Sequence, residues 1–319
     1  EVIGRGDLLT ASGGGVGESF ARLLVRADVG QDRSFRRVSR SPLGEQLAEV
    51  GRAVLRGEGP ISVAYPIGNT DRSVGTRLSG EIAGIRGDAG LRDGELKIRL
   101  SGTAGQSLGA FLVSGIEIDL FGVANDYVGK GMGGGSIAIR PFTRSSTVPH
   151  GAGNACLYGA TGGALYIAGT VGQRFAVRNS GARAVVEGTS DHLCEYMTGG
   201  VVAVLGPTGR NVAAGMTGGI LFLYDVDTSV KAQVSDSAPA PRRLDKADAE
   251  MLRGIIETHV GRTGSVRGTE LLADWSRTVR HFWVLRPQTT EADDRRPAEI
   301  EVTGIRRERA VGSWNTPPS

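Results

Sequence analysis

Cysteine is scarce in this sequence, with only Cys156 and Cys194 among 319 residues. No Cys-x-x-Cys pair occurs, so the chain by itself cannot build a thiolate zinc site or an iron–sulfur cluster. Two thiols in a protein of this size are typical of small, buried, reduced residues in a cytosolic protein. We therefore expect a cytoplasmic location and no metal or cluster bound by this chain.

Long apolar runs and blocks of like charge are also missing. No stretch of 18 apolar residues is present, which argues against a membrane-spanning helix, and no secretory signal pattern opens the chain. The net charge of +3 comes mostly from arginine spread along the sequence, without a basic cluster interleaved with aromatics. We expect neither a nucleic-acid partner nor a membrane partner. The first residue is Glu1 rather than Met, so we expect a processed chain or a piece of a longer one.

Glycine, in contrast, is abundant, at 50 residues, or twice the usual share of about 7%. A short phrase recurs between residues 94 and 225: one or two glycines, then a strand of alternating apolar residues. Successive phrases are 21, 20, 28, 18, 19 and 19 residues apart, measured between their second glycines. These are Gly94, Gly115, Gly135, Gly163, Gly181, Gly200 and Gly219. A nearly fixed period of this length predicts a solenoid, whose coils bury their apolar faces against one another.

The strands within each phrase alternate with a period of two, which predicts a parallel β-helix of at least seven coils. The Leu-x-x-Leu-x-Leu pattern of leucine-rich repeats is missing, and a propeller blade needs about 40 residues. We expect glycines at the corners between faces. One set of side chains should point inward: Leu96, Ile98, Leu100, Ile116, Ile118, Leu120, Ile137 and Ile139. The long step of 28 residues predicts a loop that leaves the solenoid over residues 141–154.

Four segments follow from this pattern. Residues 1–70 should form a connecting segment with one helix that starts at Ser41-Pro42, followed by a strand over residues 61–67. Residues 71–228 should form the β-helix, after a short helix near residues 74–86 that presents Val74, Leu78, Ile82 and Ile85 on one face. A polar linker and two capping helices (residues 245–260 and 269–279) should occupy residues 229–286. The charged tail, residues 287–319, should be loosely ordered.

Both glycine-rich candidates for phosphate binding are weak. Residues 129–135 hold a lysine among glycines, but a P-loop needs its lysine after the glycines and before a helix. Gly102, Gly105 and Gly109 resemble a dinucleotide fingerprint only loosely, without a βαβ unit around them. We interpret both stretches as corners of coils.

Three polar groups also favour structural interpretations. Asp191, His192, Cys194 and Glu195 could pair a nucleophile with a base, but they fall within one turn and lack an orienting third group. Residues 125–127, 174–175 and 178–179 occupy equivalent places after glycines, where stacked Asn and Arg side chains can satisfy backbone groups. Glu117 and Asp119 share an outward strand face, but nothing selects them as a glycosidase pair over ordinary solvated residues. We assign no catalytic, cofactor-binding or metal-ligating residue.

Several long phrases, in order, resemble the C-terminal glycine-repeat (GXGXG) domain of the glutamate synthase large subunit. They are Asn69–Glu81, Gly105–Phe111, Ala124–Met132, Leu157–Gly163, Arg174–Gly181, Cys194–Gly200 and Gly209–Gly219. The resemblance covers roughly residues 1–285 and implies a right-handed β-helix. The chain departs from the family in its charged tail, residues 287–319, and at residues 143–153, where its loop is shorter than the family's.

What the resemblance implies is part of an amino-acid oxidoreductase that turns glutamine, 2-oxoglutarate and reductant into two glutamates. Its amidotransferase and FMN domains precede this region, with the FMN and a 3Fe-4S cluster held there, and a reductase subunit is a further partner. This chain would be their scaffold and not catalytic alone. Alternatives are the glycine-repeat subunit of an N-methylglutamate synthase-like or formylmethanofuran dehydrogenase-like complex. A β-helix carbohydrate-active enzyme, such as a polysaccharide lyase, is an alternative of another class.

Overall fold

The computed structural model describes residues 41–142 and 148–287. All of these belong to one of the two units into which the chain divides, residues 40–319. The expectations for residues 1–40 and for the tail from residue 288 onward lie outside the described residues.

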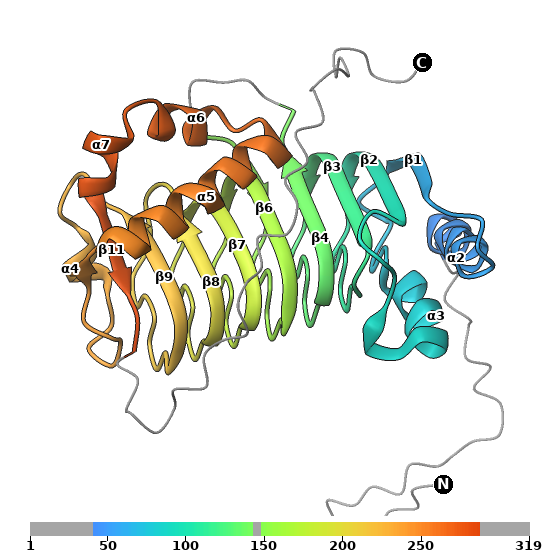
Figure 1. The fold of residues 1–319 in the computed structure, drawn as a ribbon, viewed down its shortest axis with the longest axis horizontal. Helices are drawn as coiled ribbons and strands as arrows, with labels where there is room; N and C mark the ends of the chain where they lie inside the picture. Colours follow the sequence, from blue (N-terminus) through green and yellow to red (C-terminus); the bar gives the residue numbers. More distant parts are fainter. Residues whose placement is uncertain (1–40, 143–147, 288–319) are drawn as a thin grey trace, which may run out of the picture. The chain divides into compact units, whose positions relative to one another are not determined.

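Parallel strands stacked side by side form the body of this unit (Figure 1). In sheet order they are β1 (Ile61–Ile67), β2 (Leu96–Ala104), β3 (Ile116–Ala124), β4 (Gly133–Arg140), β6 (Gly162–Val171), β7 (Ser180–Thr189), β8 (Thr198–Val204) and β9 (Gly218–Tyr224). Equivalent residues of successive strands are in register, as in Ile98 beside Ile118 and Ile118 beside Ile137. The predicted β-solenoid is therefore confirmed, and β1 has the predicted bounds.

The solenoid has about six turns, slightly fewer than the seven or more that we predicted. Each of the seven glycine phrases does introduce a strand, from β2 to β9. One turn leads from one strand to the next, so the seven strands that follow the glycine phrases are connected by six turns. Counting phrases therefore overstates the number of turns. The prediction counted strands as if each were a complete coil.

The inward-facing residues form one continuous core. All eight that the alternation selected are at most 2% exposed: Leu96, Ile98, Leu100, Ile116, Ile118, Leu120, Ile137 and Ile139. Because the strands are parallel and in register, each apolar side chain stacks on its equivalent in the next coil. Burial of such side chains contributes roughly 1.5–3 kcal/mol each and is the main term that holds the coils together.

Glycine is required where each strand begins. Gly163 has φ +82°, and a Cβ there would lie 2.6 Å from the carbonyl oxygen of Gly134 in the preceding coil. A side chain would therefore meet both an unfavourable backbone region and a steric clash. Gly181, the one second glycine outside the positive-φ region, is limited by close approach alone, since its Cβ would lie 2.1 Å from Thr161 O.

Two helices close the N-terminal end of the solenoid. The first, α2 (Pro42–Leu55), begins with Pro at its first position and buries Leu43, Leu47 and Val54 against the core. The second, α3 (Thr76–Arg86), buries Leu78 and Ile82 and is followed by the short 3-10 helix η2 (Gly87–Ala89). The prediction for Ile85 was wrong. It is 70% exposed, because it lies in the last turn of α3 beyond the edge of the core.

The long step between β4 and β6 is only in part a loop. Residues 143–147 lie outside the description, but β5 (His150–Ala152) already pairs in parallel with β3 and β6. Ala152 is fully buried. The chain thus rejoins the solenoid earlier than the predicted return after residue 154, because Ala152 continues the apolar stack next to Ala124 and Val171.

The C-terminal end of the solenoid is closed by the segment that we predicted as a linker. Within it, α4 (Val230–Gln233) places Val230 in the core, and Val234 bridges in parallel to Val212 of the last coil. The antiparallel strand β11 (Phe282–Leu285) then pairs with β9, and β10 (Arg242–Arg243) pairs with β11.

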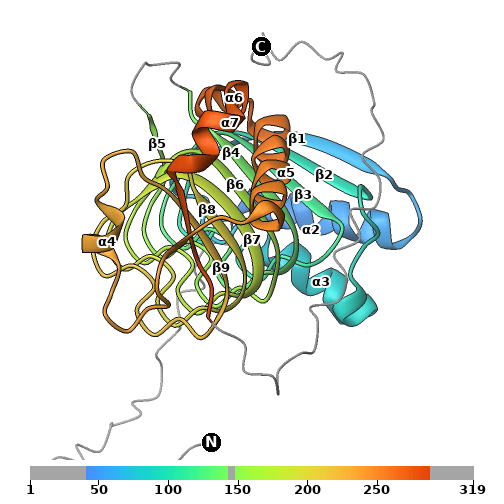
Figure 2. The same cartoon turned by 60° about the vertical axis from the view of Figure 1, so that its left-hand side comes forward.

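The predicted capping helices instead lie across the outer face of the sheet (Figures 1 and 2). The first, α5 (Lys246–Thr263), begins with Asp245 in a capping box. A second core forms between α5 and the sheet, including Leu252 and Ile256 with Val185 and Phe222. Met251, on the same helix, is 36% exposed and lies outside this core.

The second predicted late helix is three shorter elements. They are α6 (Val266–Ala273), α7 (Trp275–Thr278) and the 3-10 helix η3 (Val279–His281). The break comes at Asp274, whose ψ of +59° is not helical. Leu271 of α6 is buried against the same sheet face as α5.

Candidate functional site

The segments that return from one strand to the next have an unusual backbone. In each of six coils, three alternate residues have positive φ, for example Arg174 (φ 62°), Ala176 (φ 56°) and Arg178 (φ 56°). The other five sets are 107/109/111, 127/129/131, 155/157/159, 192/194/196 and 211/213/215. Most of these positions are not glycine, although a left-handed conformation costs such residues about 1 kcal/mol each.

Hydrogen bonds between coils fix this conformation. Arg174 N donates to Asp191 O and Arg178 N to Glu195 O, each at 2.9 Å, while Ala176 N donates to Cys156 O in the opposite direction at 2.8 Å. The middle residue of each set turns inward, and Ala176 and Cys194 are fully buried. The outer two residues of the sets mostly face out, whereas Ala155 is buried. Exposed side chains at these outer positions form two neighbouring rows, which together we call the outward ridge: Tyr127 and Arg174 in one row, and Phe111, Arg178 and Tyr196 in the other.

Aromatic rings on the outward ridge cover glycines of the next coil. A Cβ at Gly131 would lie 2.6 Å from the ring of Phe111, and one at Gly215 would lie 2.7 Å from the ring of Tyr196. The rings are nevertheless 55% and 57% exposed. This arrangement accounts for two corner glycines and leaves the outer face of each ring open to contact.

Residues 129–135 form corners, as predicted. Gly129, Gly131 and Gly135 all have positive φ, and Gly131 N donates to Tyr158 O at 2.9 Å. The Lys130 ammonium lies over the ring of Tyr127, 5.3 Å from its centroid. The lysine is thus used in a cation–π contact with the neighbouring ridge residue.

Asx side chains stack along a second corner, where they satisfy backbone groups. Asp126 Oδ1 accepts from Asn154 N (2.7 Å), Asn154 Oδ1 accepts from Gln173 N (2.8 Å), and Asp191 Oδ1 accepts from Arg210 N (2.7 Å). Asn179 makes the same kind of contact within its own turn. Of the predicted residues, Asn125 and Asn179 do satisfy backbone groups, while Asp126, Asn154 and Asp191 do so without having been predicted. The prediction is wrong for Arg174 and Arg178, which are exposed at the outer positions of their set.

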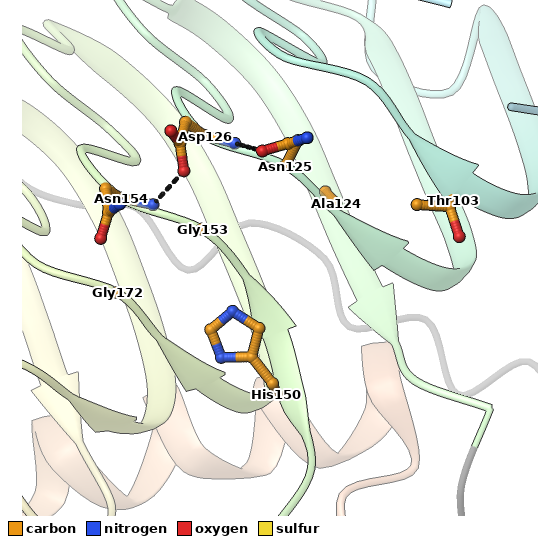
Figure 3. A pocket seen from close by; sticks show the side chains of 8 residues that line it. All are labelled: Thr103, Ala124, Asn125, Asp126, His150, Gly153, Asn154 and Gly172. Atoms are coloured by element: carbon orange, nitrogen blue, oxygen red, sulfur yellow. Dashed lines mark hydrogen bonds between the residues drawn. The ribbon is translucent and has the colours of Figure 1, made fainter. Parts of the chain in front are cut away.

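A shallow hollow of about 330 Å³ opens beside this corner (Figure 3). It is lined by polar side chains of Asn125, Asp126, His150 and Asn154, and by Thr103. The dashed contacts in Figure 3 show Asp126 occupied by neighbouring backbone. The pKa of the equivalent carboxyl, Asp191, is lowered mainly by the hydrogen bond from the Arg210 backbone. These carboxylates serve as backbone acceptors.

The fold places the side chains of His192 and Glu195 on one side of the backbone and that of Cys194 on the other. His192 Nδ1 lies 2.7 Å from Glu195 Oε1, and Asn211 Nδ2 donates to that same oxygen at 2.8 Å. The sequence had not shown Asn211 as the third member, since it comes from the next coil. Cys194 points the other way, into the core, where burial raises the pKa of its thiol. The thiol is separated from the His and Glu pair and kept protonated, so this group is no nucleophile–base pair.

The other thiol is equally unreactive. Cys156 is fully buried, and desolvation raises the pKa of its thiol to about 12. Among residues 41–142 and 148–287, no group of three or more His, Cys, Asp or Glu side chains could hold a metal ion. Within the same ranges, no helix is long and apolar enough to cross a membrane.

Glu117 and Asp119 anchor helix α5. Arg262, in the last turns of α5, donates to Asp119 Oδ1 at 2.8 Å and to Glu117 Oε2 at 3.3 Å. Lys97 Nζ lies within 3.6 Å of both carboxylates from the other side. Their place on the outward strand face thus joins the helix to the sheet across more than 140 residues of sequence.

A second polar contact under the helices was not predicted. Ser265 Oγ donates to Glu187 Oε1, and His259 Nε2 lies 3.5 Å from the same oxygen. All three residues are at most 4% exposed. A Ser, a His and a Glu scattered over residues 187–265 carry no sequence signal that would bring them together.

A family model and the similar curated proteins point to the same family for this chain. The family model described as "GXGXG motif" matches residues 44–288. The chain is 48% identical over 256 residues to the ferredoxin-dependent glutamate synthase of Pyropia yezoensis, covering 79% of this chain and 16% of that protein. It is 43% identical over 302 residues to the glutamate synthase [NADPH] large chain of Azospirillum brasilense, covering 90% of this chain and 20% of that protein.

The relatives are much longer than this chain. A third, the ferredoxin-dependent glutamate synthase 2 of Synechocystis, is 46% identical over 244 residues, which is 75% of this chain and 16% of that protein. The chain thus spans between a sixth and a fifth of the length of these curated relatives. Whatever these relatives do as whole proteins, most of their length lies outside the region described above.

Proposed function

Because this chain belongs to the GXGXG family, as a glutamate synthase C-terminal GXGXG domain, we propose that it is the scaffold of a glutamate synthase-like enzyme. In that role it holds the amidotransferase and FMN domains in position while they convert glutamine and 2-oxoglutarate into two glutamates. The FMN and the 3Fe-4S cluster belong to those other parts of the enzyme. The chain contributes rigidity and contact surface, and no reacting group.

The observation that carries this proposal is that the candidate carboxylates form hydrogen bonds and ion pairs within the fold. Asp126 and Asp191 accept from backbone, Glu117 and Asp119 hold Arg262, and Glu187 is buried. Each of these five carboxylates is engaged in holding the fold. The same contacts give no support to a carbohydrate-active enzyme, whose two carboxylates must face a substrate.

The electron donor is expected to be chosen outside this domain. The relatives are named as ferredoxin-dependent in Pyropia yezoensis and as NADPH-dependent in Azospirillum brasilense, yet both match this chain at above 40% identity. A reductase subunit, where one is needed, would therefore be selected by other parts of the enzyme. We place the protein in the cytoplasm, a proposal supported by two free, fully buried cysteines.

The test compares the 319-residue chain alone, the remainder of the same enzyme alone, and the two mixed. We expect the chain alone to bind no FMN, by absorbance, and to hydrolyse no glutamine. Adding it to the remainder should raise the rate of glutamate formation from glutamine and 2-oxoglutarate. Glutamine hydrolysis or FMN binding by the chain alone would contradict the scaffold role, as would a remainder that is fully active without it.

A further inference from the structure

We propose that the outward ridge is the surface through which this domain binds the catalytic part of its enzyme, and that the facing surface of that partner is acidic. This inference rests on the proposed scaffold function and adds where the contact lies and what chemistry recognises it. The residues that carry it are Arg174, Arg178 and Tyr196.

The first reason is the conformation of these three residues. Their φ values are 62°, 56° and 53°, in the left-handed region. Gly131, Gly159 and Gly215 occupy the equivalent place to Arg178 and Tyr196 in other coils. A glycine there would relieve strain, so a large side chain at such a position opposes stability. Residues that break a local rule in this way are the ones expected to have a functional role.

The second reason is charge. Arg174 and Arg178 are exposed, and within the described residues neither guanidinium forms an ion pair. The nearby carboxylates are already engaged, Asp191 by Arg210 and Glu195 by His192 and Asn211. Two guanidinium groups on one coil are suited to carboxylates, which arginine binds through two parallel hydrogen bonds.

The third reason is the composition and placement of the ridge. Arg178 N is bonded to Glu195 O, so Arg178 and Tyr196 stand side by side in successive coils, about 4.8 Å apart. Arginine and tyrosine are the residues that most often carry the binding energy of protein interfaces. The relatives supply a partner of sufficient size, since about four-fifths of their length lies outside the matched region.

The test measures the affinity between the 319-residue chain and the remainder of the same glutamate synthase, made as a separate chain, by isothermal titration calorimetry. The double variant Arg174→Glu/Arg178→Glu should raise Kd about 100-fold, as expected for two central contacts. Tyr196→Ala should raise Kd about tenfold. Wild-type binding should weaken as salt is added, and less steeply for the double variant.

The matched control is Lys246→Glu/Arg253→Glu on α5, which changes the net charge by the same amount. Both side chains are exposed, at 91% and 55%, and this variant should bind like the wild type. Circular dichroism melting checks that all variants remain folded. If the wild type binds and the ridge variant binds equally well, the ridge proposal is overturned and the scaffold role stands. If the wild type does not bind the remainder at all, both proposals are overturned.

Discussion

The two outer surfaces of the solenoid differ in whether other parts of the chain cover them. The sheet face is covered by the chain's own α5 and α6, and its carboxylates Glu117, Asp119 and Glu187 are bound by side chains from those helices or the turn between them. The outward ridge keeps its arginines and aromatic rings exposed. The same repeating coil thus builds a surface closed by intramolecular contacts and a surface open to contact. Stability is concentrated on the first and, we propose, recognition on the second.

The strongest way to disrupt the covered surface is to remove apolar contact under α5. Ile256 is fully buried in the second core, so Ile256→Ala should lower the free energy of unfolding by about 2–5 kcal/mol. Met251→Ala, on the same helix but 36% exposed, should cost much less. Urea unfolding followed by circular dichroism measures both. Equal losses would mean that burial of Ile256 against the sheet adds no stability beyond that of an exposed side chain on α5.

A smaller effect is expected at the polar contact between the helices and the sheet. Ser265 caps α6 by accepting from Gly268 N and donates to buried Glu187. Ser265→Ala should therefore cost about 2 kcal/mol, from the lost cap and the acceptor left without its donor. Ser276→Ala, at an exposed position, serves as control in the same unfolding assay and should change little. A neutral Ser265→Ala would show that this contact is dispensable.

The same substitution should have opposite signs on the two surfaces. Arg178→Gly on the ridge relieves a left-handed residue and should stabilise the chain by about 0.5 kcal/mol after the added freedom of the unfolded glycine is deducted. Arg253→Gly inside α5 should destabilise it by about 1 kcal/mol. Thermal unfolding compares the pair directly. If Arg178→Gly destabilises as much as Arg253→Gly does, the ridge conformation is not strained.

The smallest expected effect is one of pH. The folded-state pKa of Asp191 is lowered, chiefly by the Arg210 backbone donor. A lowered pKa stabilises the fold above the unfolded-state value of 3.8, and this stabilisation is lost as pH falls through the folded-state value. Asp191→Asn keeps an acceptor oxygen but loses the charge. It should be less stable than wild type at pH 7, with the difference shrinking on acidification.

On the covered surface, Asp245→Asn at the cap of α5 should behave in the same way, since the pKa of Asp245 is lowered mainly by the Asp248 backbone donor. Urea unfolding of the wild type and both variants between pH 7 and pH 3 measures the effect. A stability difference that does not depend on pH would rule out the carboxylate charge as its source.

The repeating part of the fold could be predicted because each coil repeats the same local sequence pattern, a glycine followed by a strand of alternating apolar residues. A period-two pattern placed Leu96 and Ile118 in the core, and Pro42 marked the start of α2. Amphipathic spacing also predicted a helix near α5, but spacing does not say which surface a helix covers. The contacts that decide its position, such as Arg262 with Asp119, join residues 143 apart in sequence, and nothing local indicates them.

The outward ridge could not be predicted for a different reason. Positive φ is normally signalled by glycine, yet here hydrogen bonds between coils hold Arg174, His192 and Tyr196 in that region. The backbone of each return segment is therefore set by its neighbours rather than by its own residues. For the same reason the His192–Glu195–Asn211 cluster was missed, because its third member comes from the next coil.

Because the positive-φ residues recur at equivalent positions in successive coils, the length of this domain could change by whole coils. Arg174 and His192 occupy the same position in successive coils, so removing residues 174–191 would join Gln173 to a residue with the same backbone conformation. The shortened chain would keep both of its end closures and lose about 4.8 Å of height. Evolution or an engineer could therefore change the separation between whatever is attached at the two ends in steps of one coil, once the contacts of the removed coil with the helices and with the Arg210 corner are replaced.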